Sequence, residues 1–191
     1  GIDFDLCVDA GPTALNGIPA GGSWSGNGVT NPNGEFTAAN AGVGLHTLTY
    51  TYEDPVTNCV NFDTVHVNVN DLPIVNAGID TTICNQPFPV QFDGTPVGGV
   101  WSGSNITNAG VFTPNGVGNY TITYTFTLGT GCENSDDRII TVVDPVQADA
   151  GVDREICINE PDFQINGLPG GGTWTGTNVT AGGLFSPIAD G

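Results

Sequence analysis

The five cysteines are the side chains with the clearest capacity for covalent chemistry in this sequence of 191 residues. No two of them form a CxxC pair, and a structural zinc site needs four ligands, so a metal role is disfavoured. We predict two disulfides, Cys7 with Cys59 and Cys84 with Cys132. Each would close a loop of about 50 residues and stabilise the fold by roughly 4 kcal/mol in the chain-entropy model. Such pairs indicate an oxidising compartment.

The cysteines belong to a repeated unit that also carries a tryptophan in a glycine-rich frame. The motif is written GGSWSG around Trp24, GGVWSG around Trp101 and GGTWTG around Trp174. A cysteine lies 17 residues before each tryptophan. Fixed spacing of this kind is typical of a module array. We predict modules at residues 1–77, 78–150 and 151–191, the third being partial.

The third copy contains one cysteine, Cys157, and stops at Gly191, which matches Gly118 of the second copy. We therefore expect the chain to be a segment of a longer protein, with the disulfide partner of Cys157 beyond Gly191. The joints between copies are short and lack Gly/Ser tracts, which favours a stiff array.

Alternating side chains indicate that each module is built from strands. The segment Tyr120-Thr-Ile-Thr-Tyr-Thr-Phe126 has a period of two, so we expect Ile122, Tyr124 and Phe126 to face the core. About seven such short strands per module, with no helical period, predict an antiparallel sandwich. The predicted fold class is all-β, with tandem immunoglobulin-like sandwich repeats of about 75 residues and one disulfide each. Both cysteines of a module are expected to meet at one pole of its sandwich.

Charge and composition exclude several classes of partner. The formal net charge is -18, with only two basic residues, so nucleic acid and anionic membrane are disfavoured as electrostatic partners. No apolar run approaches the roughly 18 residues of a membrane span. We therefore expect neither nucleic-acid binding nor direct membrane insertion.

Catalysis has little support in the sequence. The only histidines, His46 and His66, both lie in the first copy and are replaced by Tyr120 and Ile139 in the second. No repeated unit therefore holds a histidine-based nucleophile system, and we predict no catalytic residues and no enzyme. No cofactor is expected, with one hypothesis kept open: acidic residues gather near the joints and could bind calcium. They are Asp71, Asp80, Asp144, Asp149 and Asp153.

The repeated tryptophans allow two interpretations. A large aromatic side chain in register next to a strand is typical of core packing. Exposed tryptophans would instead be platforms for sugar rings, and the chain would then be a carbohydrate-binding array of a secreted enzyme. Trp24, Trp101 and Trp174 are interpreted as core residues. A self-assembling surface filament remains a further alternative.

The combined motif of AGxD, Cys, PxGGxWSG, GxFTP, TxTYT and Cys resembles the immunoglobulin-like repeats of Bacteroidota cell-surface adhesins. SprB-like gliding adhesins, exported by type IX secretion, carry long arrays of similar modules. The resemblance implies an extracellular location on the cell surface, outside the outer membrane, and a structural and adhesive role. It also implies partners such as surface polysaccharide, the substratum, other copies of the chain, and the outer-membrane secretion and motility machinery. A Bacteroidota O-glycosylation pattern matches at Thr64 and Thr81.

Overall fold

The computed structural model describes residues 1–187 and divides into two compact units. The first unit spans Gly1–Val142 and the second begins at Val143. Each unit is described by itself. Among the described residues, no helix is long and apolar enough to span a membrane.

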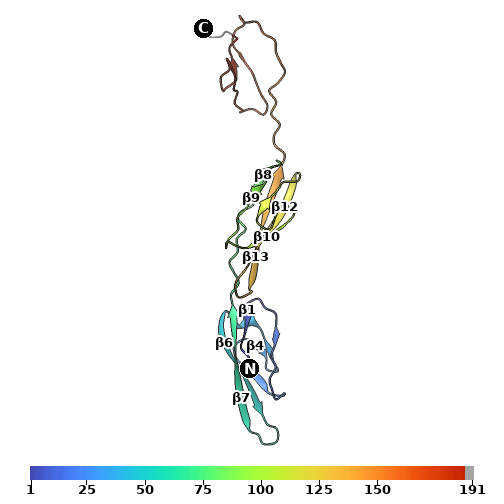
Figure 1. Cartoon of the computed structure of the whole chain (residues 1–191), viewed down its shortest axis with the longest axis vertical. Helices are drawn as coiled ribbons and strands as arrows, with labels where there is room; N and C mark the ends of the chain where they lie inside the picture. The colour runs from blue at the N-terminus through green and yellow to red at the C-terminus, as the bar shows by residue number, and fades with distance from the viewer. Residues whose placement is uncertain (188–191) are drawn as a thin grey trace. The chain divides into compact units, whose positions relative to one another are not determined.

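The first module has a four-stranded sheet with the order β1-β7-β6-β3 and a three-stranded sheet with the order β2-β5-β4 (Figure 1). Its two long strands, β6 and β7, form an antiparallel hairpin in which Gly44 pairs with Val69 and Glu53 with Val60. The elements are β1 (Phe4–Cys7), β2 (Thr13–Ala14), β3 (Ser23–Ser25), β4 (Val29–Asn31), β5 (Glu35–Phe36), α1 (Ala38–Ala41), β6 (Gly44–Glu53) and β7 (Val60–Asn70).

The second module repeats this plan. Its main sheet has the order β10-β12-β13-β8, and a second sheet pairs β11 with β9. Here the long hairpin is β12 with β13, in which Gly118 pairs with Val142 and Thr127 with Glu133. The elements are β8 (Thr81–Cys84), β9 (Val90–Gln91), β10 (Val100–Gly103), β11 (Val111–Phe112), β12 (Gly118–Thr127) and β13 (Glu133–Val143).

The predicted all-β sandwich class is confirmed, with three differences in detail. Strand β1, the first of the module, runs parallel to β7, the last. The pairs β3–β6 and β6–β7 are antiparallel. The segment Phe88-Pro-Val-Gln-Phe92 alternates between apolar and polar side chains and is therefore expected to be a strand, but it forms one only at Val90–Gln91, and Phe88 itself is 69% exposed. One disulfide links the two modules, instead of one within each.

Each module of the first unit has its own hydrophobic core. The buried residues of the first core lie between Leu15 and Val69, and those of the second between Ala77 and Val142. Ile122 and Tyr124 are buried as the alternation predicts, while Phe126 is half-buried. Ala77 packs into the second core, and its N–H donates to Asp136 Oδ2 at 2.8 Å. The predicted module boundaries stay predictions.

The second unit contains a two-stranded sheet of β14 (Phe163–Gln164) and β15 (Leu184–Phe185). Bridges between Asp149 and Leu168 and between Val179 and Phe185 complete its described pairing. The residues that would match the long hairpin of the other modules are not in this sequence, because Gly191 matches Gly118. The four residues from 188 onward lie outside the described part.

Candidate functional site

The repeated tryptophan forms the same corner in both modules of the first unit. Trp24 pairs across the sheet with Tyr50, and Trp101 with Tyr124. The ring centroids lie 5.1 and 4.9 Å apart, with the planes tilted. Trp24 is 8% and Trp101 3% exposed, so neither presents a ring face on which a sugar could stack.

The tyrosine hydroxyl explains the glycines and proline of the motif. Tyr124 Oη accepts the N–H of Gly99 at 2.7 Å and donates to the carbonyl oxygen of Pro96 at 2.6 Å. The Thr95-Pro96 peptide bond is cis. A Cβ on Gly99 would lie 2.5 Å from the Tyr124 ring and from the carbonyl oxygen of Thr125, so only glycine admits this approach. The proline and glycines of the motif therefore allow the tyrosine to pack closely against the backbone.

The disulfide differs from the predicted within-module pairs. Cys7 bonds to Cys132 of the next module, with Cα atoms 5.5 Å apart and a sequence separation of 125. Among the described residues, Cys59, Cys84 and Cys157 carry free, exposed thiols. The pairs Cys7 with Cys59 and Cys84 with Cys132 are thus corrected, as is the expectation that both cysteines of a module meet at one pole.

The strand register gives the physical reason. Cys7 pairs with Asn70, the last residue of β7, while Cys59 immediately precedes Val60, the first residue of that strand. At about 3.3 Å per residue, the 11 residues of β7 place Cys7 and Cys59 roughly 36 Å apart. A disulfide requires Cα atoms within about 7 Å. The two cysteines of one module therefore lie at opposite poles.

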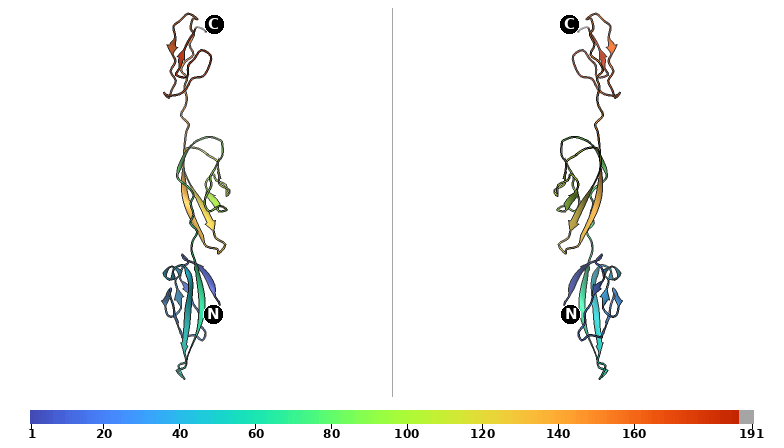
Figure 2. Two further views of the ribbon diagram at one scale, coloured as in Figure 1. Left: turned by 90° about the vertical axis from the view of Figure 1, so that its left-hand side faces the viewer. Right: turned by 90° about the vertical axis from the view of Figure 1, so that its right-hand side faces the viewer.

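The hairpin tip of the second module lies against the end of the first. Figure 2 shows the β12–β13 hairpin, yellow to orange, beside the end of the first module where β1 and β7 finish. Thr130 and Gly131 of this hairpin share a hollow of about 440 Å³ with residues of the first module. Those residues are Asp5, Leu6, Cys7, Asp9, Ala10 and Asn70. We call this contact the disulfide joint.

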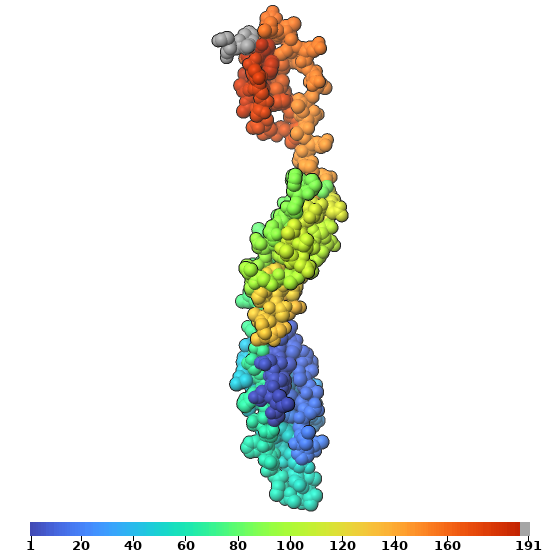
Figure 3. Space-filling model, viewed as in Figure 1, coloured from blue at the N-terminus to red at the C-terminus, as the bar shows by residue number. Residues whose placement is uncertain are grey.

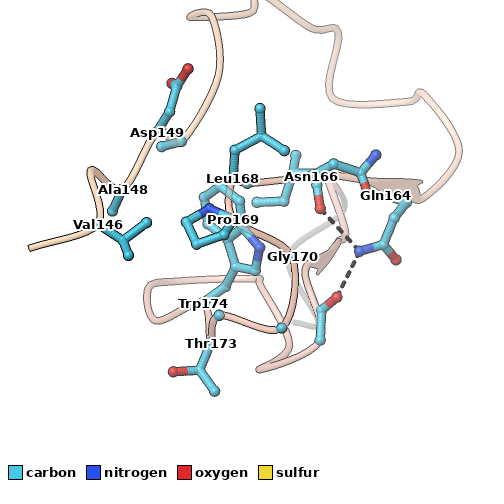
Figure 4. Close-up of a pocket in the computed structure, with 16 residues that line it drawn as sticks. Val146, Ala148, Asp149, Gln164, Asn166, Leu168, Pro169, Gly170, Thr173 and Trp174 are labelled. Atoms are coloured by element: carbon cyan, nitrogen blue, oxygen red, sulfur yellow. Dashed lines mark hydrogen bonds between the residues drawn. The ribbon is translucent and has the colours of Figure 1, made fainter.

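A cavity lies inside the second unit, around Trp174. It has a volume of about 640 Å³, and Figure 3 shows an opening among the orange and red atoms of this unit. In Figure 4, Trp174, Pro169 and Leu168 lie together along it, while Gln164 Nε2 donates to the carbonyl oxygens of Ile165 and Gly182.

This cavity corresponds to the space that a tyrosine fills in the other modules. A Cβ on Gly94 would lie 2.4 Å from the Tyr124 ring, whereas at the matching Gly167 the nearest atom is the carbonyl oxygen of Asp149, at 3.2 Å. At Gly172, the counterpart of Gly99, a Cβ would meet nothing within 4 Å. The cavity is therefore the place of a core side chain that is absent from the described residues of this unit, and it is not evidence of a ligand site. Trp174 is half-buried beside it.

The histidines are held by local contacts. His46 Nε2 lies 2.7 Å from the carbonyl oxygen of Gly42. His66 Nδ1 lies 3.4 Å from Asp3 Oδ1, which also accepts the backbone N–H of His66 at 2.8 Å. That backbone hydrogen bond is the main cause that lowers the pKa of Asp3. The arrangement indicates structural roles for both histidines.

The acidic residues near the joints make separate contacts. Asp71 accepts the N–H of Leu72, Asp80 that of Ile139 and Asp149 that of Gly151, at 2.8, 2.9 and 2.8 Å. Within residues 1–187, no three acidic, histidine or cysteine side chains are grouped closely enough to hold a metal ion. The calcium hypothesis, which also names Asp144 and Asp153, stays a prediction. An unchanged melting temperature in millimolar calcium and in chelator would remove it.

The two predicted glycosylation positions differ in accessibility. Thr64 is exposed on β7. Thr81 is half-buried, and its hydroxyl donates to the carbonyl oxygen of Ile79 at 3.2 Å and accepts a hydrogen bond from Arg138. The Thr64 side chain is therefore the more accessible of the two. Modification itself stays a prediction, which the intact mass of the native protein tests.

Arg138 is a structural residue that the sequence reasoning did not single out. Its guanidinium carbon lies 4.4 Å from the centroid of the Phe92 ring, and its Nη1 donates to the carbonyl oxygen of Ala77 at 3.4 Å. Burial lowers the pKa of Arg138 below its usual value. The sequence could have pointed to Arg138, because it is one of only two arginines and lies on the last strand of a module.

Strand order and cores define this chain as an array of immunoglobulin-like sandwich modules. The sequence matches no protein-family model and no curated protein. Similar solved structures include Sidekick-1 immunoglobulin domains 1–5, at 12% identity and a TM-score of 0.28, covering 74% of this chain and 37% of that one. Drosophila N-cadherin EC1–4 is matched at 12% identity and 0.30, covering 96% and 64%. Mouse protocadherin-24 EC1–3 is matched at 11% and 0.32, covering 96% and 81%. The chain thus spans about a third of the Sidekick-1 structure.

Proposed function

We propose that this chain is a structural and adhesive repeat segment of a long, secreted cell-surface protein. Its modules would form a stalk that holds a binding region away from the cell and transmits force between the two. The observation that carries this proposal is the Cys7–Cys132 disulfide, because the chain segment that it closes contains nearly all of both cores.

A load on the two chain ends would pass through this bond. The residues between Cys7 and Cys132, which have a sequence separation of 125, could otherwise be pulled out to a length of up to roughly 430 Å. With the bond in place, the load bypasses them, and the shortest covalent path contains only the β13 part of the second core, Ile140 and Val142. A protein that spans distance under tension benefits from this arrangement, whereas a binding module or an enzyme has no such need.

The finer assignment rests on the resemblance in the sequence. We propose an SprB-like adhesin of a gliding Bacteroidota cell, exported by type IX secretion, with substratum polysaccharide or other copies of itself as partners. Burial of Trp24 and Trp101 supports a spacer over a carbohydrate-binding array, because the array would need exposed rings. Many weak contacts along a surface layer of such stalks would add up to firm adhesion.

Pulling single molecules tests the mechanical role. Handles on both termini of the 191-residue chain would be drawn apart before and after reduction with a thiol. We expect reduction to release up to roughly 400 Å of additional length, because both cores enter the load path. Cys59→Ser is the matched control, since it removes a thiol and leaves the Cys7–Cys132 bond. Equal released lengths before and after reduction would overturn the proposal.

Labelling with an antibody on living cells that produce the protein tests the cellular role. Label that travels along the cell surface supports a mobile gliding adhesin. Label that stays fixed on the surface contradicts the gliding role but is consistent with a cell-surface stalk. Label found only in the medium contradicts both the gliding role and the cell-surface stalk.

A further inference from the structure

The two free cysteines of the first unit stand at the same places in their modules as the two bonded ones. Cys84 ends β8 as Cys7 ends β1. Cys59 immediately precedes β7 as Cys132 precedes β13, and both of these strands have 11 residues. Each module therefore carries one strand-end cysteine and one hairpin cysteine, at opposite poles.

The two hairpins present their cysteines in the same way. The N–H of Asp54 donates to the carbonyl oxygen of Cys59 at 2.9 Å, and the N–H of Leu128 donates to that of Cys132 at 2.8 Å. These hydrogen bonds close the two loops at the same point. The hairpin that carries the free Cys59 is thus built like the hairpin that carries the bonded Cys132.

The residues next to the two cysteines also match. Asn58 and Gly131 directly precede them and both have a left-handed backbone, with φ of 55° and 88°. Before these come Thr57 and Thr130, and Thr130 lines the hollow of the disulfide joint. The tip of the first hairpin, whose loop is one residue longer, therefore presents its cysteine in the same Thr-x-Cys segment as the tip that docks on the first module.

Cys7 and Cys157, which stand 17 residues before the tryptophans of their repeats, share a local turn. The carbonyl oxygen of Cys7 accepts the N–H of Ala10 at 2.9 Å, and that of Cys157 accepts the N–H of Glu160 at 3.1 Å. The Cys84 and Cys157 thiols are exposed. Cys59 cannot bond to Cys84 of the same chain, because two module lengths, each roughly 36 Å of strand, separate these poles.

We propose that Cys59 and Cys84 each form a further disulfide joint with the complementary cysteine of another repeat of the same type. A hairpin cysteine bonds only to a strand-end cysteine, so the modules join head to tail as the first two do. Each bond forms from two thiols, which lose two protons and two electrons. A low-molecular-weight disulfide accepts them and is reduced to two thiols.

Such joints would overlap along the chain. Cys84 lies inside the loop that Cys7 and Cys132 close, so a bond from Cys84 to a following repeat would begin before the first loop ends. Overlapping loops leave no complete module outside a disulfide. This linkage rule concerns which cysteines bond, and it does not depend on the proposed adhesive role.

The test uses two copies of the 191-residue chain as the two repeats. Reduced protein is oxidised with glutathione disulfide at high concentration, and the covalent oligomers are digested with a protease that cuts before aspartate. Each cysteine then lies in its own peptide. Cys59 falls in 54–62, Cys84 in 80–92 and Cys157 in 153–161.

We expect the peptide 54–62 to be linked to 80–92 or to 153–161. These unlike pairs should outnumber 54–62 linked to itself by roughly tenfold, which corresponds to about 1.4 kcal/mol of docking preference. The variant Cys59→Ser should abolish covalent oligomers, because it removes the one free hairpin cysteine, while Cys7–Cys132 still forms. Cys84→Ser should retain only links to 153–161.

Two results would overturn the proposal. One is a predominance of like pairs, such as 54–62 with itself or 80–92 with 153–161, which unguided collision of exposed thiols produces. The other is a chain that forms Cys7–Cys132 and remains monomeric under these conditions. The pulling experiment above is unaffected by either result, so the two proposals fail separately.

Discussion

Tyr50 and Tyr124 show how one hydroxyl group can determine a sequence motif. Each ring packs on the tryptophan of its module, and each hydroxyl group bridges a glycine N–H and a proline carbonyl oxygen. The bridged glycine cannot carry a Cβ, because the ring lies too close. The tryptophan, tyrosine and glycine of the motif therefore contact one another and are used in packing.

Tyr124→Phe should destabilise the second module by roughly 1–2 kcal/mol, because the Gly99 N–H loses its acceptor in a partly buried place. Urea unfolding of the disulfide-bonded chain measures the change. Tyr52→Phe, at a half-buried ring packed against the other core, is the control and should change stability by less than about 0.5 kcal/mol. Equal effects of the two variants would contradict the role of the Tyr124 hydroxyl group.

Asp54 gives the first hairpin a pH dependence. Its carboxylate accepts the N–H groups of Val56 at 2.8 Å and Thr57 at 3.1 Å, and these bonds hold its pKa below the usual 3.8. A lowered native pKa means that the contribution to stability is present above pH 3.8. It is lost as the pH falls through the native value.

We therefore expect the amide hydrogens of Val56 and Thr57 to lose their protection from exchange when Asp54 is protonated. Hydrogen exchange read by NMR at a series of acidic pH values measures this, after correction for intrinsic exchange rates. Asp54→Asn should weaken the protection already at neutral pH, because the amide oxygen is a weaker acceptor than a carboxylate. Protection that is independent of pH would contradict the role of Asp54.

At the scale of elements, the long hairpin determines each module. Strands β6 and β12 carry the tyrosine and pair on one side with the tryptophan strand and on the other with the last strand. The second unit lacks this hairpin among its described residues, and there the cavity beside Trp174 remains open. The short strands therefore depend on the long hairpin for their packing.

Gly99→Ala should destabilise the second module by about 1–3 kcal/mol, because the new methyl group meets the Tyr124 ring and a carbonyl oxygen. Thermal unfolding measures the loss. Gly129→Ala is the matched control, since a Cβ there meets nothing within 4 Å. A Gly99→Ala protein as stable as this control would contradict the prediction, because it would show that the Tyr124 ring can move away from residue 99 without loss of stability.

For the whole molecule, the inter-module disulfide couples two separate cores. Closing a loop of 125 residues stabilises the folded chain by roughly 5 kcal/mol in the chain-entropy model. The double variant Cys7→Ser with Cys132→Ser should lose up to this amount in denaturant unfolding. Its control, Cys59→Ser with Cys84→Ser, keeps the bond and should unfold like the parent monomer. A double variant as stable as its control would contradict the coupling.

The sequence alone was sufficient to predict the repeat, the sandwich class and the alternating core of the long strands. These properties are local, because a period of two and a recurring Trp-Gly frame are written in consecutive residues. The same reasoning predicted packing for Trp24 and Trp101 over exposed platforms, and both are buried. The sequence did not predict that each tryptophan packs on a tyrosine of a later strand, Tyr50 or Tyr124.

Only the tertiary structure decided which cysteines meet. Cys7 and Cys59 share a module, and their spacing favours a bond between them, yet the length of β7 separates them. Cys132 lies 125 residues from Cys7 in sequence and reaches it because a hairpin tip docks on the end of the preceding module. A repeat pattern describes each module but not which poles of neighbouring modules touch. Disulfide pairing depends on that contact in space.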